Sequence, residues 1–400
     1  MLSYDYTLKL LDLQEVLIDK LDEFDFSINV FVSSNKNIPV CSCGCRCHIH
    51  DYRVQKIKAG KNRNKNVFIF LKKRRFVCPI HKKIFTETFP FVSKRHRIHS
   101  NICAQVIDRL RDCVSMTGVA KQFNISTSTV MRYFDLVSYP SIKEAPEVMA
   151  IDEFKGNTGG FKYNTIITNP STKEVLDIFK TRDLEYLKTC FSLVKQREKV
   201  MFFIQDMWEP FKRAVKSKFK NAKIVADKYH YTRQVTWAME NVRKREQQRL
   251  SKEDRLFFKR SKYILNKPRE KLSYEEELYL KRMFSYSYEL EQAYRLKETF
   301  RDFLRERDYQ KSRRELEIWK GMAEESKLKE FSSAITAITN WKEEILNSKL
   351  IKETNGFTEG CNNKIKVLKR CGYGFRNFER FRNRILHIFN KKSPNLATSC

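Results

Sequence analysis

The sequence predicts a multidomain α+β protein in which small N-terminal modules precede an α/β core interrupted by helices. Three observations carry this prediction. Cysteines crowd residues 41–78, two short helical patterns follow one another in residues 117–134, and strand-like and helix-like segments alternate from residue 147. A chain of 400 residues is long enough for two to four domains. We divide it into residues 1–95, 96–140, 147–232, 233–350 and 351–400.

The charge of the chain points to a polyanionic partner. There are 79 basic and 48 acidic residues, a net charge of +31. Such a surface attracts phosphate and releases condensed counterions, which makes nucleic acid the leading partner. No apolar run approaches the roughly 18 residues of a spanning helix, and the first residues lack the order of a signal peptide. We therefore expect a cytoplasmic protein without a membrane partner.

The first module is predicted to be a zinc finger. Residues 1–40 resemble an amphipathic helix followed by the strand SINVFV, and VFIFL and RRFVC resemble further strands. Clustered cysteines in a reducing compartment are more often metal ligands than disulfides. The expected zinc ligands are Cys41, Cys43, Cys78 and His81. The other residues that compete for the first ligand pair are Cys45, Cys47, His48 and His50. A loop of free thiols is the alternative.

A basic run beside the second ligand pair favours a finger that faces nucleic acid. It consists of Lys72, Lys73, Arg74 and Arg75. Downstream, TGVAKQFNISTSTVMRYF predicts a helix-turn-helix with Ser126 as the N-cap of the second helix. The side chains expected to face a major groove are Thr127, Ser128, Thr129 and Arg132. A two-helix corner of an ordinary bundle is the alternative.

From residue 147 the pattern changes to strands. VMAIDEF, FKYNTIITNP and KEVLDIFKTRD predict a three-strand meander, and two helix–strand pairs follow, ending in AKIVADKYHY. This β-β-β-α-β-α-β order is that of the ribonuclease-H-like fold. Its first and fourth strands are neighbours, so Asp152 and Asp206 are expected to converge. Since successive strand residues point to opposite faces, Glu153 is expected to pair with a base or to be solvated.

The remaining chain is expected to be helical. Residues 233–350 carry apolar residues at helical spacing and read as an all-α insertion into the catalytic core. After a turn at residues 354–356, a helix would present Glu359, Asn363 and Lys366 on one face. Glu359 is the candidate third carboxylate, with Glu353 excluded by its place before the turn. An arginine-rich end that includes Arg376 suits a DNA backbone, or an amphipathic helix packed on the sheet.

Together these motifs resemble the ISL-three family of bacterial insertion-sequence transposases, which are DDE-type enzymes. The motifs are HDYR at 50–53, RRFVC at 74–78, IDEF at 151–154, DM at 206–207, ADKYH at 226–230 and NGFTEGCNNKIK at 355–366. The resemblance covers nearly the whole chain. It implies that Asp152, Asp206 and Glu359 form the catalytic triad. The family's finger has two C-x-x-C pairs, whereas here a C-x-C run precedes a pair that ends in His81.

The resemblance implies strand cleavage and strand transfer on double-stranded DNA, both at the element's ends and at the target. Three carboxylates suit two Mg²⁺ or Mn²⁺ ions, and Zn²⁺ is expected in the finger. Asp227, His230 and Asn363 are expected to assist at the site, although Asp227 and His230 could instead only close the fifth strand. Pairing of two element ends implies a homodimer or higher state, associated with the bacterial nucleoid. The rivals are a non-catalytic DNA-binding regulator and a resolvase-like or RNA-directed nuclease.

Overall fold

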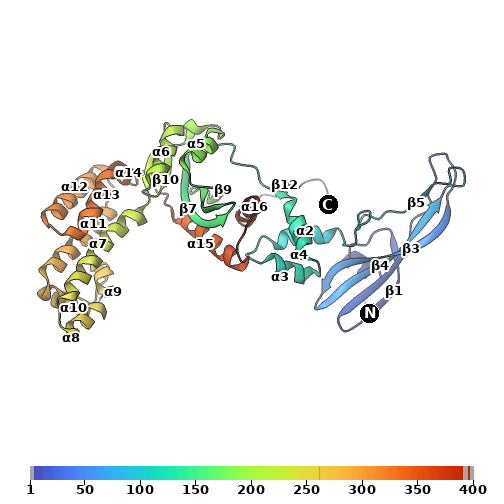
Figure 1. Ribbon diagram of the computed structural model, residues 1–400, viewed down its shortest axis with the longest axis horizontal. Coiled ribbons are helices and arrows are strands. Elements are labelled where there is room, and N and C mark those ends of the chain that lie inside the picture. Colours follow the sequence, from blue (N-terminus) through green and yellow to red (C-terminus); the bar gives the residue numbers. More distant parts are fainter. Residues whose placement is uncertain (1–3, 261, 391–394, 397–400) are drawn as a thin grey trace. The chain divides into compact units, whose positions relative to one another are not determined.

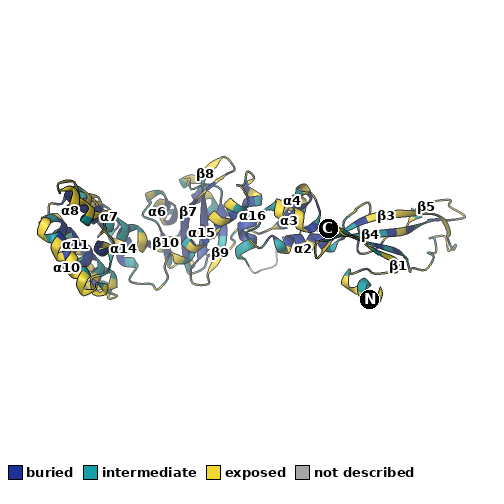
Figure 2. Ribbon diagram, turned by 90° about the horizontal axis from the view of Figure 1, so that it is seen from below, coloured by how far each residue is buried: buried dark blue, intermediate teal, exposed yellow. Residues whose placement is uncertain are grey.

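The computed structural model describes residues 4–260, 262–390 and 395–396, and the chain divides into two compact units. One unit comprises Met1–Pro140, Asn157–Gly159 and Lys364–Cys400; the other comprises Ser141–Gly156 and Gly160–Asn363. Figure 1 labels the elements of both units, and Figure 2 colours them by burial. Within the described ranges, no helix combines the length and the apolar character needed to cross a membrane.

The first unit begins with a short helix and a five-stranded sheet. The strands run in the order β1-β2-β4-β3, with β5 beside β4. Their bounds are α1 Tyr4–Leu10, β1 Val16–Glu23, β2 Ser27–Ser34, β3 His48–Asn62, β4 Lys65–Val77 and β5 Ile84–Thr86. The helix predicted near the N-terminus is therefore wrong beyond Leu10. Val16 and Ile18 alternate with exposed residues, and both enter the core formed by β2, β3 and β4.

The helix-turn-helix predicted downstream is confirmed. Its helices are α3 Met116–Phe123 and α4 Thr127–Asp135, preceded by α2 Asn101–Arg109. Asn124 ends α3 with a φ of 55°, in the left-handed region that Asn tolerates. The Ser126 hydroxyl accepts a hydrogen bond from the Thr129 amide at 3.1 Å, which is the predicted N-cap.

Helix α16, Phe378–Phe389, packs against this helical module and uses arginines to do so. Arg384 is 1% exposed and donates to the carbonyls of Asp112 and Val114, at 2.8 and 3.0 Å. Arg382 donates to the carbonyls of Tyr139 and Pro140. These two arginines stabilise the module, which agrees with the packed amphipathic helix that is the alternative to a DNA contact, except that the helix packs here on the helical module and not on the sheet. The last pairing in this unit joins β12 Asn395–Leu396 to β6 Val137–Ser138.

The second unit is built on a five-stranded sheet of order β11-β10-β7-β8-β9. The strands are β7 Val148–Thr158, β8 Phe161–Asn169, β9 Glu174–Phe179, β10 Phe202–Gln205 and β11 Lys223–Ala226. β7, β10 and β11 are parallel neighbours, whereas β8 and β9 are antiparallel. The predicted meander and the two later strands are thus confirmed. The fifth strand ends at Ala226, because Asp227 caps a helix that takes the sequence KYHY.

Helices cover both faces of this sheet. On one face, Met149 and Ile151 pack against α5 Leu184–Ser192 and α6 Glu209–Lys218. On the opposite face, helix α15 Gly356–Cys371 contacts the strands, and the Thr358 hydroxyl lies 2.9 Å from that of Thr168 on β8. Asp152 follows Ile151 and therefore points to the α15 face.

Between β11 and α15 the described chain is helical. The helices are α7 Lys228–Gln248, α8 Lys252–Arg260, α9 Lys262–Asn266, α10 Tyr274–Tyr286, α11 Tyr288–Arg305, α12 Tyr309–Glu325, α13 Ser332–Asn340 and α14 Lys342–Asn347. They share one apolar core in which Phe300 packs on Phe303 and Trp319. The ammonium of the half-buried Lys349 donates to the carbonyls of Phe303 and Glu306, both at 2.8 Å, and so satisfies the end of α11.

Candidate active site and metal-binding clusters

Two carboxylates lie close together at the carboxyl end of β10, beside its central neighbour β7. Gln205 pairs with Ile151 in the parallel register, so the next residues on the two strands are Asp206 and Asp152. Asp152 is 9% exposed. Its Oδ1 accepts the Glu153 amide at 2.7 Å, and its Oδ2 accepts Nδ2 of Asn362 at 2.9 Å. Burial, and secondly the charge of Asp206, raise the pKa of Asp152 to about 8.

A second pair of groups extends this site along the start of α7. His230 Nε2 lies 2.9 Å from Oδ1 of Asp206 and 3.7 Å from Oδ2 of Asp227. An ionised carboxylate can only accept a hydrogen bond, so the Nε2 atom of His230 carries the proton. Burial of the imidazole lowers the pKa of His230, but the hydrogen bond to Asp206 and the two negative charges outweigh it and raise the pKa. Asp206, Asp227 and His230 thus form one cluster, with ligand atoms within 4.8 Å of one another.

Glu359 lies on α15 between two asparagines that contact carboxylates of the site, Asp152 and Asp227. Asn362 contacts Asp152, and Asn355 Nδ2 donates to Oδ2 of Asp227 at 3.3 Å. Glu359 is four residues after Asn355 and three before Asn362, so the three side chains share a face of the helix. The Glu359 amide donates to the Asn355 carbonyl at 2.9 Å. The side chain of Glu359 is half-buried.

The face of α15 that the sequence predicts at the site differs by about one residue from the face that the structure buries. Asn363 and Lys366 are exposed, whereas Asn355 and Asn362 are buried against the carboxylates. The sequence prediction therefore omits Asn362 and places Asn355 only in a turn. Their separation of seven residues, two helical turns, is the signal that could have identified them.

A small pocket opens beside Asp206 on the α6 side of the sheet. It measures about 220 Å³, and its lining includes Glu153, Arg182, Asp206, Trp208 and His230. Glu153 and Arg182 form an ion pair at 2.5 Å, as the sequence predicted for Glu153. The Arg182 guanidinium also lies 4.7 Å from the centre of the Trp208 ring. The two adjacent carboxylates at 152 and 153 therefore have different environments.

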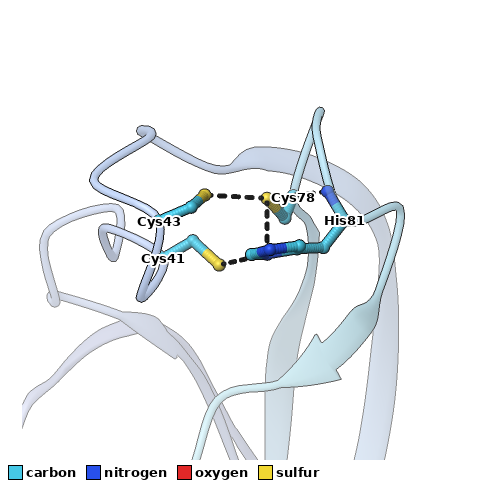
Figure 3. Close-up of side chains that lie close together, drawn as sticks. All are labelled: Cys41, Cys43, Cys78 and His81. Atoms are coloured by element: carbon cyan, nitrogen blue, oxygen red, sulfur yellow. Dashed lines mark hydrogen bonds between the residues drawn. The ribbon is translucent and has the colours of Figure 1, made fainter.

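The second cluster, in loops beside the N-terminal sheet, contains three thiols and an imidazole (Figure 3). Cys41 Sγ lies 3.4 Å from His81 Nδ1, and Cys43 Sγ lies 3.6 Å from Cys78 Sγ. The four potential ligand atoms lie within 4.8 Å of one another. An amide hydrogen bond from Cys43, and then the His81 imidazole, lower the pKa of Cys41 to about 6, which favours the thiolate that metals bind. The cluster is compatible with zinc.

The basic run of β4 is placed differently from the prediction. Lys73 is only 8% exposed, Arg74 pairs with Glu87 at 3.1 Å, and Arg75 pairs with Asp51 at 2.8 Å. Successive strand residues point to opposite faces, so four consecutive side chains cannot face one partner. The expectation of a single nucleic-acid face is wrong for these three residues, and Lys72 is exposed.

The recognition helix presents most of the expected side chains. Ser128 and Arg132 are exposed and Thr127 is half-buried. Thr129 is buried at 6%, and its hydroxyl lies 2.8 Å from that of Ser126, so its predicted place in a groove is wrong. Lys366 and Arg376 are exposed.

Comparisons with known proteins identify the family. Residues 149–385, more than half of the chain, match the DDE family of ISL3 elements, which is described as "Transposase". The chain belongs to the ISL3 transposase family. Residues 87–138 match the helix-turn-helix domain of transposase family ISL3. The ISL3 chain is also 23% identical over 305 residues to the transposase for insertion sequence element IS1001 of Bordetella parapertussis, covering 74% of each chain.

Proposed function

We propose that this transposase cleaves DNA at the ends of an insertion sequence and joins them to a target through Asp152, Asp206 and Glu359. The sheet order β11-β10-β7-β8-β9 supports a ribonuclease-H-like core, with residues 233–350 as an all-α insertion. The single observation that carries the proposal is the contact of Asn362 with Asp152, since it brings α15, which holds Glu359, against the carboxylates of β7 and β10.

The site is chemically suited to divalent cations. A buried carboxyl whose pKa is raised by burial and by a neighbouring carboxylate is a site that a cation would stabilise in its ionised form. Asp152, Asp206 and Glu359 would hold two Mg²⁺ or Mn²⁺ ions, which polarise water or a 3′-hydroxyl and stabilise the leaving oxygen. Asn362 and the Glu153 amide fix the orientation of Asp152. His230 holds Asp206, and Asn355 holds Asp227.

We assign DNA recognition to the unit that contains the helix-turn-helix. The match of residues 87–138 supports binding of terminal repeats by α4, through Thr127, Ser128 and Arg132. Lys72, Lys366 and Arg376 would add contacts to phosphates, and a homodimer or higher assembly would pair two ends. Zinc on Cys41, Cys43, Cys78 and His81 would close the N-terminal finger.

The test compares Glu359→Gln with Glu353→Gln on a duplex that carries the flanking element end, with Mg²⁺ or Mn²⁺. Glu353 is a suitable control because it precedes α15 and accepts a hydrogen bond from Ser171. We expect cleavage to fall about 100-fold or more in Glu359→Gln, which corresponds to about 2.7 kcal/mol, and to persist in Glu353→Gln. If both variants and the wild type bind the duplex and none cuts it, the chain is a DNA-binding regulator on an inactive scaffold.

A further inference from the structure

An exposed aromatic stripe runs along α7 from the candidate active site. Tyr229, Arg233 and Trp237 are spaced four residues apart and therefore lie on one side of the helix. Tyr229 is 54% exposed and Trp237 is 52% exposed. The Arg233 guanidinium lies between the two rings, 5.3 Å from the Tyr229 centroid and 4.5 Å from the Trp237 centroid. Large rings that stabilise a core are usually covered, and these two are not.

The charge of the stripe is suited to an anionic partner. The Arg233 side chain is half-buried, and its Nε is a buried atom with no hydrogen-bond partner among the described residues. A groove of about 470 Å³ continues the stripe beyond Trp237 and is lined by Lys244 and Lys262. Glu240 also lines this groove, but its carboxylate pairs with Arg243 at 2.8 Å and Lys262 at 3.3 Å. An apolar protein partner would bury the Arg233 charge at a cost, whereas a phosphate backbone would pair with it.

The stripe begins where the proposed chemistry takes place. Asp227 caps α7, and the Tyr229 ring packs edge-on against His230 with centroids 5.6 Å apart. From Tyr229 to Trp237 the helix rises about 12 Å, the length of three to four stacked nucleotides. A strand whose scissile phosphate lay at the carboxylates would therefore extend along these rings.

We propose that Tyr229, Arg233 and Trp237 form a stacking platform for unpaired bases of the DNA strand next to the scissile phosphate. The inference rests on the proposed function for the identity of the strand. Exposed rings accept any base through its π-face, and an interleaved arginine adds a cation–π contact and a phosphate partner. The three are positioning residues, because they hold the strand and take no part in bond breaking.

The first experiment measures binding of a short oligo(dT) by the tryptophan fluorescence of the full-length protein. Of the four tryptophans, Trp319 is fully buried, Trp341 is 8% exposed and Trp208 is half-buried, so Trp237 is the ring most open to a base. We expect quenching in the wild type that is lost in Trp237→Phe, while Trp237→Phe retains the affinity. Trp237→Ala should weaken binding by about 5- to 100-fold. Tyr274→Ala, which removes a 76% exposed ring on α10, is the matched control and should bind as the wild type does.

The second experiment measures cleavage of the element-end duplex by the same variants. If Trp237→Ala binds oligo(dT) and cleaves like the wild type, the stacking platform is refuted while the proposed function stands. If the wild type shows Trp237 quenching but never cleaves, the proposed function fails, and the stripe is a stacking surface for single-stranded DNA without a scissile phosphate beside it. If Trp237 is quenched by raising the protein concentration without DNA, the stripe is an interface between two copies, and the proposal is overturned.

Discussion

The side-chain amide of Asn362 donates a 2.9 Å hydrogen bond to Oδ2 of Asp152, joining residues 210 positions apart in the chain. The other Asp152 oxygen accepts the Glu153 amide, so both oxygens of the carboxylate are oriented. The same amide of Asn362 lies 3.4 Å from the Glu153 carbonyl. One side chain of α15 thus contacts both the side chain and the backbone of β7.

We expect Asn362→Ala to reduce metal-dependent cleavage by about 10- to 100-fold, because an orienting partner of a metal-binding carboxylate is lost. Binding to the element-end duplex should not change, since the recognition helix lies in the other unit. Cleavage rates at saturating DNA would measure the effect. Asn340→Ala, an exposed asparagine at the end of α13, is the control. A normal rate in Asn362→Ala would show that the contact does not orient the site.

Asp152→Asn should stabilise the metal-free protein at alkaline pH. The folded-state pKa of Asp152 is about 8, above its ordinary value of 3.8, so the folded state retains a proton that the unfolded state loses. Its contribution therefore destabilises the fold progressively as pH rises from about 4 to 8. The gain in the variant at pH 8.5 should be a few kcal/mol at most, at about 1.4 kcal/mol per pKa unit.

Urea unfolding at pH 5 and pH 8.5, with and without Mg²⁺, would test this pH dependence. The advantage of Asp152→Asn should be larger at pH 8.5, and Mg²⁺ should stabilise the wild type more than the variant. An equal effect of the substitution at both pH values would contradict a raised pKa.

Zinc should bind in a ratio of one ion per chain. Cys41→Ser, Cys43→Ser, Cys78→Ser and His81→Ala should each lose it, because the four ligand atoms converge. Cys45→Ser is the matched control, since Cys45 lies in the same loop but contributes its carbonyl to the Cys41 amide. A chromophoric chelator would measure the released ion. Loss of zinc in Cys45→Ser alone would favour another pairing of the C-x-C run.

Acid should destabilise the helical module through His387. Its Nε2 donates to the Ile107 carbonyl at 2.7 Å and its Nδ1 accepts the Tyr139 hydroxyl at 2.8 Å, an arrangement that requires the neutral ring. Burial lowers the pKa of His387 to about 4. The unfolding free energy that the neutral ring contributes is complete above about pH 6.5. As the pH falls from 6.5 to 4, about 3 kcal/mol of it is lost.

The comparison of wild type with His387→Gln isolates this contribution from other titrating groups. Between pH 7.5 and 4.5 the wild type should lose more unfolding free energy than the variant, as measured by urea titration followed by circular dichroism. His99 also has a pKa lowered by burial, so part of the acid sensitivity should remain in the variant. Equal losses in the two proteins would show that His387 does not titrate as stated.

Local sequence signals predicted the elements that depend on few distant contacts. Strand-like runs separated by turn residues predicted β7–β9, and Ser126 predicted the start of α4, because turns and caps act within a few residues. Tertiary contacts decided the rest. Arg382 and Arg384 resemble part of a DNA-binding patch in sequence, but their guanidinium groups donate hydrogen bonds to backbone carbonyls within residues 112–140. Likewise, the choice between Asn362 and Asn363 depended on which helix face met the sheet.

Both compact units depend on the same short stretch of late sequence. Residues 356–363 complete the carboxylate site, and α16 fills the helical module with Arg382, Arg384 and His387. During synthesis, neither unit can reach its final packing until the ribosome has passed residue 390. A product terminated before Gly356 therefore lacks the candidate third carboxylate and also the helix that supports the recognition module. Truncated copies would thus be poor competitors for the element's ends, rather than dominant inhibitors.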